Sequence, residues 1–240
     1  MTLLTVVRDV CAVVGVTLPP SVFGNINTDR TAQEMLALAN EVAQRIAYDT
    51  RDWRALIGAA SYDGTSTPVE TNGSSVCPLP SDYKRMLLTS NVRRNSQPSQ
   101  ALQFIPDIDA WLESRTSGDS VSSSGGEWTI FSDTMRIYPR IAEGDTAGFI
   151  YLDKNCVRLA GGGFGDRFID DADSYRLDER LLKLGMIWQW KAQKGSSYAE
   201  DLGTYGDALT NAMGHDKPAP IIIDRRPISA MRGTYFGDIP

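Results

Sequence analysis

The spacing of apolar residues changes along this chain from a helical period to a strand period and back again. Near the N-terminus, and again after residue 176, apolar side chains recur with the spacing that is typical of amphipathic helices. Between these regions they occur in short alternating runs separated by turn-forming residues, which is typical of antiparallel strands. This order predicts an α+β fold in which a β-rich domain is inserted into a helical frame.

The helical segments predict an antiparallel helical core of about four helices. We expect helices over residues 3–14, 31–46, 177–194 and 198–212. Thr2 and Gly15 suit the start and the end of the first helix. A short Gly-Ser linker separates the last two helices, so these should fold back on each other as a hairpin. Ile46 and Trp188 lie on the apolar stripes of their helices, and we expect both to be buried in the shared core.

Two Asx-Gly dipeptides, at residues 63–64 and 72–73, mark the first half of the predicted insertion. They predict tight hairpins that join strands over residues 55–62, 65–71 and 74–79. Later runs predict strands over residues 128–131, 135–138 and 147–152, and a short helix over residues 106–112 that is anchored by Trp111. We expect loops in the Ser/Gly-rich residues 114–126 and in the glycine-rich residues 160–165.

These elements divide the chain into four predicted parts. They are an N-terminal helical part (residues 1–54), a β-rich insertion (residues 55–164), a C-terminal helical hairpin that completes the helical core (residues 165–217) and an extended C-terminal arm (residues 218–240).

The C-terminal arm is the segment that most clearly calls for a partner. It has no helical spacing, and its prolines at 218, 220 and 227 favour an extended chain, yet it is too apolar for a solvated tail. An isoleucine run can add as a strand to an exposed sheet edge, arginine pairs bind carboxylates, and aromatic side chains anchor interfaces. We therefore expect the arm to dock on a partner protein or on a neighbouring copy through Ile221, Ile222, Ile223, Arg225, Arg226, Tyr235 and Phe236.

Charge argues against a general affinity for nucleic acid. The chain has 24 Lys and Arg residues against 30 Asp and Glu residues, a formal net charge of −6. Four cations, Lys84, Arg85, Arg93 and Arg94, have no acidic residue between them. They could contact DNA phosphates, protect a strand edge, or meet an acidic neighbouring subunit, and the sequence leaves these alternatives open.

No residue pattern predicts a catalytic, cofactor-binding or metal site, and we expect no cofactor. The one histidine, His215, follows the last predicted helix and suits a helix end better than a catalytic role. The glycines of residues 161–165 are not followed by the Gly-Lys-Ser/Thr of a phosphate-binding loop, so we interpret them as a hinge. The acidic residues 170, 171, 173 and 178 lack the calcium-loop pattern and fit a solvated, helix-capping turn.

The N-terminal residues and the cysteines indicate the cellular compartment in which the protein is made. Arg8 and Asp9 interrupt the first apolar run, which argues against a secretory signal, so we expect a protein made in the cytoplasm. No apolar stretch is long enough to span a bilayer. Cys11, Cys77 and Cys156 match no metal or redox spacing, and we expect reduced, buried thiols.

Several short motifs follow one another between residues 1 and 217. In order they are Asp52-Trp53, Leu79-Pro80-Ser81-Asp82-Tyr83, Met135-Arg136-Ile137-Tyr138-Pro139, a Leu-Asp-Glu-x-Leu-Leu-x-x-Gly-x-x-Trp run from Leu177 to Trp188, and Tyr198 with Tyr205. This order resembles that of the head-to-tail connector adaptor proteins of tailed bacteriophages, particularly the larger adaptors of short-tailed phages.

The resemblance implies a structural protein of the virion at the head–tail junction, assembled in the bacterial host cytoplasm. It implies a ring of copies, dodecameric in that family, that docks under the portal protein, links the capsid to the tail and forms part of the DNA exit channel. Tail nozzle, tube or tail-fibre proteins would bind below, and genomic DNA would pass without sequence-specific binding. Two other readings stay open: a virion-associated peptidoglycan hydrolase, and a tail-tube or tail-terminator component.

Overall fold

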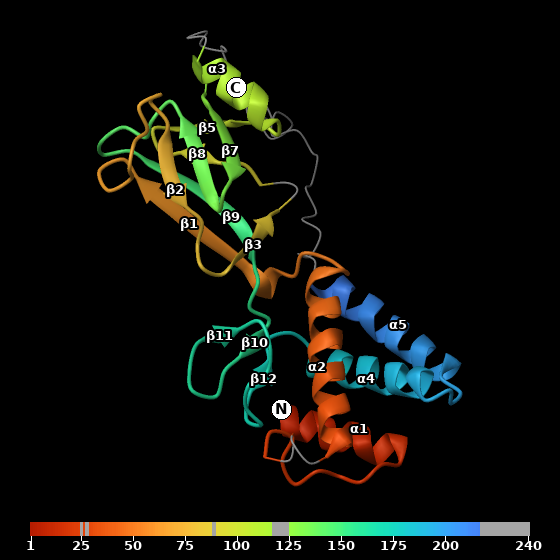
Figure 1. The fold of residues 1–240 in the computed structure, drawn as a ribbon. Helices are drawn as coiled ribbons and strands as arrows, with labels where there is room; N and C mark the ends of the chain where they lie inside the picture. Colours follow the sequence, from red (N-terminus) through yellow and green to blue (C-terminus); the bar gives the residue numbers. More distant parts are fainter. Residues whose placement is uncertain (25, 27–28, 88–89, 117–124, 217–240) are drawn as a thin grey trace, which may run out of the picture.

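The computed structural model describes residues 1–24, 26, 29–87, 90–116 and 125–216 (Figure 1). The fold is mixed α+β, as predicted, with helices toward both ends and mainly antiparallel sheets between them. The described helices are α1 (Leu3–Val14), α2 (Arg30–Tyr48), α3 (Ile108–Thr116), α4 (Glu179–Gln193) and α5 (Ala199–His215), with a short 3-10 helix at Arg54–Leu56. The described strands are β1 (Ile57–Asp63), β2 (Ser75–Pro78), β3 (Tyr83–Met86), β4 (Arg93–Arg94), β5 (Gln97–Ala101), β6 (Gln103–Phe104), β7 (Glu127–Phe131), β8 (Thr134–Tyr138), β9 (Thr146–Asp153), β10 (Val157–Arg158), β11 (Phe164–Gly165) and β12 (Ser174–Tyr175).

Helices α1, α2, α4 and α5 contribute to one apolar core. Ile46 of α2 is fully buried in it, as predicted. Gly185 of α4 lies where α4 passes between α2 and α5, because a Cβ atom there would be 2.5 Å from Val42 Cγ1 and 3.3 Å from the Tyr205 ring. The absence of a side chain at Gly185 therefore lets three helices approach closely.

The prediction that Trp188 is buried is wrong. Trp188 is only partly buried and lies beside the rings of Tyr198 and Tyr205, with centroid distances of 6.5 and 6.1 Å. The buried tryptophan of α4 is Trp190, on the face that also buries Leu182 and Met186. Helix α4 contacts α1 and α2 as well as α5, so it is apolar over a wide arc, and one stripe could not be chosen from spacing alone.

Two sheets pack face to face in the β-rich part (Figure 1). The first has the order β1-β9-β4-β5, with β3 also paired to β9, and the second has the order β2-β8-β7-β6. Phe149 and Tyr151 of the first sheet and Met135 and Ile137 of the second belong to the same buried cluster. The strands predicted over residues 128–131, 135–138 and 147–152 are therefore present, as β7, β8 and β9.

The two predicted Asx-Gly hairpins are not formed as expected. The chain does turn after Asp63, but β1 pairs with the distant β9, from Ile57 opposite Leu152 to Asp63 opposite Thr146. Residues 65–71 form no strand, and the turn at residues 72–73 closes only an isolated bridge between Val69 and Ser75. The turn signals were correct, but strand pairing depends on side chains far away in the sequence.

The β-rich part joins the helical core through adjacent segments. Leu56 just before β1, Leu87 after β3 and Leu152 near the end of β9 are buried with the helices, whereas Tyr151 belongs to the cluster between the sheets. Arg176, just before α4, donates to the Asp153 carboxylate at 2.5 Å and to the Ala55 carbonyl at 2.8 Å. The junction is thus fixed by both apolar and charged contacts.

Helix α3 packs against the second sheet through a buried charge. Trp111 is fully buried, as expected for the anchor of this helix. Arg115 pairs with Glu127 of β7, and the two side chains are only 4% and 2% exposed. The Arg115 guanidinium also lies over the rings of Trp111 and Tyr138, 4.6 and 3.6 Å from their centroids.

Candidate functional site

The outer face of the first sheet carries exposed apolar side chains beside β1. Alternate residues of β1 point away from the second sheet, and Ile57 and Ala59 among them are exposed. Ile150 of β9 lies directly opposite Ala59 and is 41% exposed. A shallow hollow of about 400 Å³ on this face is lined in part by Ala59, Arg93, Gly148 and Ile150. An uncovered sheet face of this kind suits contact with another protein.

Lys84 and Arg85, two of the four cations singled out in the sequence as candidate contact residues, lie on β3 beside the helical core. The Lys84 ammonium is 4.9 Å from the centroid of the Tyr48 ring, close enough for a cation–π contact. Arg85 forms an ion pair with Asp52 at the end of the N-terminal helical part. Both cations therefore hold the β-rich part against the helices.

Arg93 and Arg94, the other two cations, form β4. The Arg93 guanidinium donates to the Pro98 carbonyl at 2.9 Å, and the Arg94 guanidinium donates to the Pro139 carbonyl. Burial lowers the pKa of Arg94, while nearby Asp145 raises it in part. Arg93 remains exposed at the edge of the hollow.

The two pairs of cations do not form one patch. Arg85 lies opposite Leu152 and Arg94 opposite Ala147, five residues apart on β9, which is roughly 16 Å along a strand. Each arginine already has a partner within the chain.

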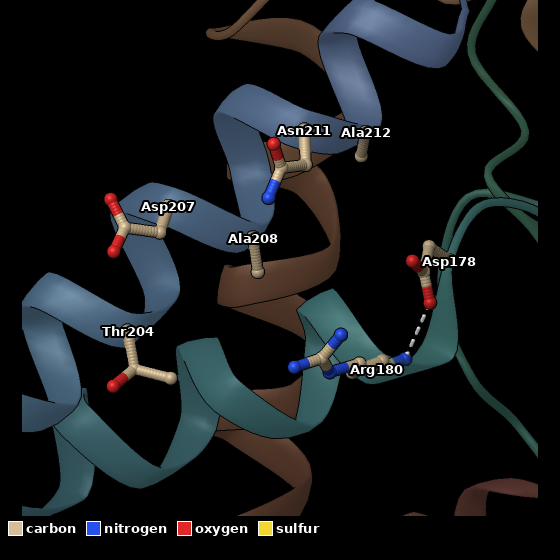
Figure 2. A pocket seen from close by; sticks show the side chains of 7 residues that line it. All are labelled: Asp178, Arg180, Thr204, Asp207, Ala208, Asn211 and Ala212. Atoms are coloured by element: carbon tan, nitrogen blue, oxygen red, sulfur yellow. Dashed lines mark hydrogen bonds between the residues drawn. The ribbon is translucent and has the colours of Figure 1, made fainter.

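A groove between the start of α4 and α5 is lined mainly by polar side chains (Figure 2). Asp178 caps α4, because its carboxylate accepts from the Arg180 backbone N–H at 2.8 Å, the bond drawn in Figure 2. Thr204, Asp207 and Asn211 line the opposite wall on α5. This arrangement offers hydrogen bonds to a polar protein surface and contains no paired nucleophile and base.

The acidic residues before α4 are used as hydrogen-bond acceptors within the fold. Asp173 is buried and accepts from the backbone N–H groups of Ala160, Ile169 and Asp170 at 2.7–2.8 Å. Asp171 accepts from the Ser21 hydroxyl at 2.5 Å. Within the described ranges, no group of three or more His, Cys, Asp or Glu side chains could hold a metal ion.

In the glycine-rich segment, residues 161–163 lie in the turn of a small hairpin, and residues 164–165 form its second strand, β11. The interpretation of this segment as a hinge stays a prediction. Strand β10 pairs with β11, and the Leu159 N–H donates to the Gly163 carbonyl at 3.1 Å. Gly162 and Gly163 have φ angles of 98° and 81°, which favour glycine. The glycines therefore shape a turn.

The histidine and the three cysteines considered in the sequence analysis all lie within the described residues. His215 is the last residue of α5, at a helix end as expected. Cys11, Cys77 and Cys156 are buried and free, and burial raises their pKa values, to about 12 for Cys77 and about 11 for Cys156. Over the described residues, no helix has both the length and the apolar character needed to cross a membrane.

The predicted docking residues of the C-terminal arm lie outside the described residues. They are Ile221, Ile222, Ile223, Arg225, Arg226, Tyr235 and Phe236.

Comparison with known proteins gives no family assignment: no family profile matches this chain, and no curated protein resembles it in sequence.

The outer face and edge of β1 were not predicted from the sequence as a candidate site. The signal was present in the sequence, since residues 57–62 contain no charge and no proline. Its meaning depends on β1 being the last strand of its sheet, which only the pairing with β9 reveals.

Proposed function

We propose that this protein is a structural adaptor at the head–tail junction of a tailed bacteriophage. Copies would form a ring, dodecameric by analogy with the family, that docks under the portal protein, links the capsid to the tail and surrounds the exiting DNA. Tail nozzle, tube or tail-fibre proteins would bind its lower side.

The observation that carries this proposal is the structural role of the motifs that resemble the adaptor family. Asp52 pairs with Arg85, and the neighbouring Trp53 is buried in the helical core. Asp82 accepts from the Tyr151 hydroxyl at 2.8 Å, which fixes the Leu-Pro-x-Asp-Tyr element against β9. Gly185 provides the close packing of α4. The motifs thus lie at contacts between helices, within the first sheet, and between the sheet and the helical core, which are positions that a shared architecture requires.

The pattern of charge supports the DNA-channel part of the proposal. A net charge of −6 repels phosphates, and a channel lined by acidic groups lets DNA slide. Arg85 and Arg94 are engaged within the chain, which leaves fewer cations to hold DNA. A ring whose lumen is lined mainly by Lys84, Arg85, Arg93 and Arg94 would contradict this view.

The test is the mass of the full chain, alone and mixed with the portal protein of the phage that encodes it. We expect a defined ring on the portal, measured by native mass spectrometry and seen by negative-stain electron microscopy. Deleting residues 218–240 should leave the helical signal in the far-ultraviolet circular dichroism spectrum unchanged. The same deletion should abolish ring formation and portal binding. Normal assembly of the shortened chain would refute the role of the arm.

The same preparations separate the alternatives. Clearance of a peptidoglycan suspension that one Asp or Glu substitution abolishes would favour a glycan hydrolase, which needs a carboxyl group with a raised pKa. Co-purification with a tail-tube protein in place of the portal would favour a tail-tube or terminator component.

A further inference from the structure

Strand β1 has an open edge that is long and unprotected. It ends its sheet, with β9 on one side and no strand on the other within the described part of the chain. The strand is seven residues long, and Ile57 through Tyr62 are uncharged and contain no proline. Such an edge presents backbone N–H and C=O groups that can pair with another extended chain.

The other described edges carry the features that usually prevent such pairing. Strand β5, at the opposite end of the same sheet, contains Pro98, and its pairing with β4 is interrupted by a register shift. Strand β2 has four residues and ends at Pro78, and β6 has only two residues. Strand β3 carries Lys84 and Arg85. The contrast indicates that the open edge of β1 is kept for a partner strand.

Residues 221–226 have the chemistry of that strand. They comprise three isoleucines, then Asp224, Arg225 and Arg226, between prolines at 220 and 227. Isoleucine has a high strand propensity, and proline is tolerated only at the ends of an edge strand. The six residues between the prolines nearly match the length of β1.

Charge selects the direction of the added strand. In a parallel arrangement with Ile221 beside Ile57, Ile223 lies beside Ala59, and Arg225 approaches Asp63 on the same exposed face. Hydrogen bonds from Ser66 and the Thr65 N–H hold the pKa of Asp63 below its usual range, so it is ionised at neutral pH. The antiparallel arrangement would place the arginines near Arg54 instead, which is unfavourable.

The described chain ends at the level of the start of β1. Asp216 pairs with Arg51 at 3.4 Å, and its carboxylate accepts from the Arg54 N–H at 3.4 Å, three residues before Ile57. In Figure 1 the end of α5 accordingly lies beside the end of α2, where the chain enters β1. Rotation about a ring axis preserves height, so each copy would present its arm at the level of its neighbour's β1.

We propose that residues 221–226 of one copy add as a parallel strand to the open edge of β1 in the neighbouring copy. This inference rests on the proposed ring. The linker Lys217-Pro218-Ala219-Pro220 contains two prolines, and because proline-rich linkers favour an extended chain, we expect the arm to reach away from its own subunit. The exchange would cover the open edge of β1 in each subunit and link each subunit to the next one around the ring.

Disulfide cross-linking in the portal-bound assembly tests the proposal. Full-length Ala59→Cys protein is mixed with full-length Ile223→Cys protein before assembly and then oxidised. Adjacent strands are about 4.8 Å apart, within the Cα separation that a disulfide spans. The three native cysteines are buried with raised pKa values, so the background should be low. We expect a covalent dimer that dithiothreitol reverses.

The matched control pairs Ile223→Cys with Ser99→Cys, which is exposed on the proline-protected edge β5, and should give no dimer. Ala59→Lys should abolish ring formation, whereas Ser99→Lys should not. A disulfide confined within single chains of the Ala59→Cys/Ile223→Cys double variant would overturn the exchange. A normal portal-bound ring without cross-linking at β1 would overturn this inference and leave the adaptor function standing. Failure of the unmodified protein to bind portal would overturn both.

Discussion

Because α2, α4 and α5 approach closely at Gly185, we expect an alanine there to destabilise the protein, which is the opposite of what helix propensity alone predicts. Replacing an interior helical glycine with alanine stabilises a protein by roughly 1 kcal/mol when nothing else changes. At Gly185 the new Cβ atom would lie 2.5 Å from Val42 Cγ1, a short branched side chain that cannot swing away, and 3.3 Å from the Tyr205 ring. Overpacking of this kind costs roughly 1–3 kcal/mol. With the propensity gain subtracted, we therefore expect Gly185→Ala to lose up to about 2 kcal/mol of unfolding free energy.

Gly203 of α5 provides the matched control. A Cβ atom there would have no heavy atom within 4 Å, so Gly203→Ala should gain up to about 1 kcal/mol. Urea unfolding followed by circular dichroism measures both variants, and thermal midpoints should move in opposite directions by roughly 2–4 °C per kcal/mol. The double variant Gly185→Ala/Val42→Ala should lose less than the sum of its single variants. Equal stabilisation by both glycine substitutions would refute the packing described for α4.

Three further predictions follow from buried charges and thiols. Arg115→Met should cost about 3–5 kcal/mol because it leaves Glu127 charged and buried, and adding Glu127→Leu should restore much of the loss in urea unfolding. Burial raises the pKa of Asp145, but hydrogen bonds from Ser96 and Thr146 outweigh it and hold that pKa below its ordinary value. The stabilisation is present above about pH 4 and is lost as the pH falls through the lowered pKa, so Asp145→Asn should flatten the acid limb of the stability profile. The three buried cysteines should stay unreactive toward a thiol reagent at pH 8 in native protein and become reactive in urea, whereas rapid native labelling would contradict their burial.

Elements governed by local chemistry were predictable from the sequence. Helix α1 begins after Thr2, whose side chain accepts from the Thr5 N–H, and it ends at Gly15, as the caps predicted. Strands β7 and β8 were predictable because they are joined by a short turn and pair with each other. Both cases depend on residues within a few positions of each other.

Elements governed by distant partners were not predictable. The turn after Asp63 is real, but β1 pairs with the distant β9, where Tyr62 and Phe149 stack diagonally across the two strands with ring centroids 5.9 Å apart. Trp188 and Trp190 are both apolar and two positions apart, and only the positions of α1, α2 and α5 decide which of them is buried. The candidate site at β1 was hidden for the same reason, since an edge is defined by which strand is last.

The junction at Leu56, Leu87 and Leu152 has a mechanical consequence. A β-rich part attached through one covalent strand could swivel about that strand, but here three neighbouring chain segments enter the helical core together. Twisting one part against the other would have to strain all three and also break the contact between Arg176 and Asp153. The subunit should therefore transmit torque from one end to the other as a stiff body. A force applied to its sheets would move its helices with them.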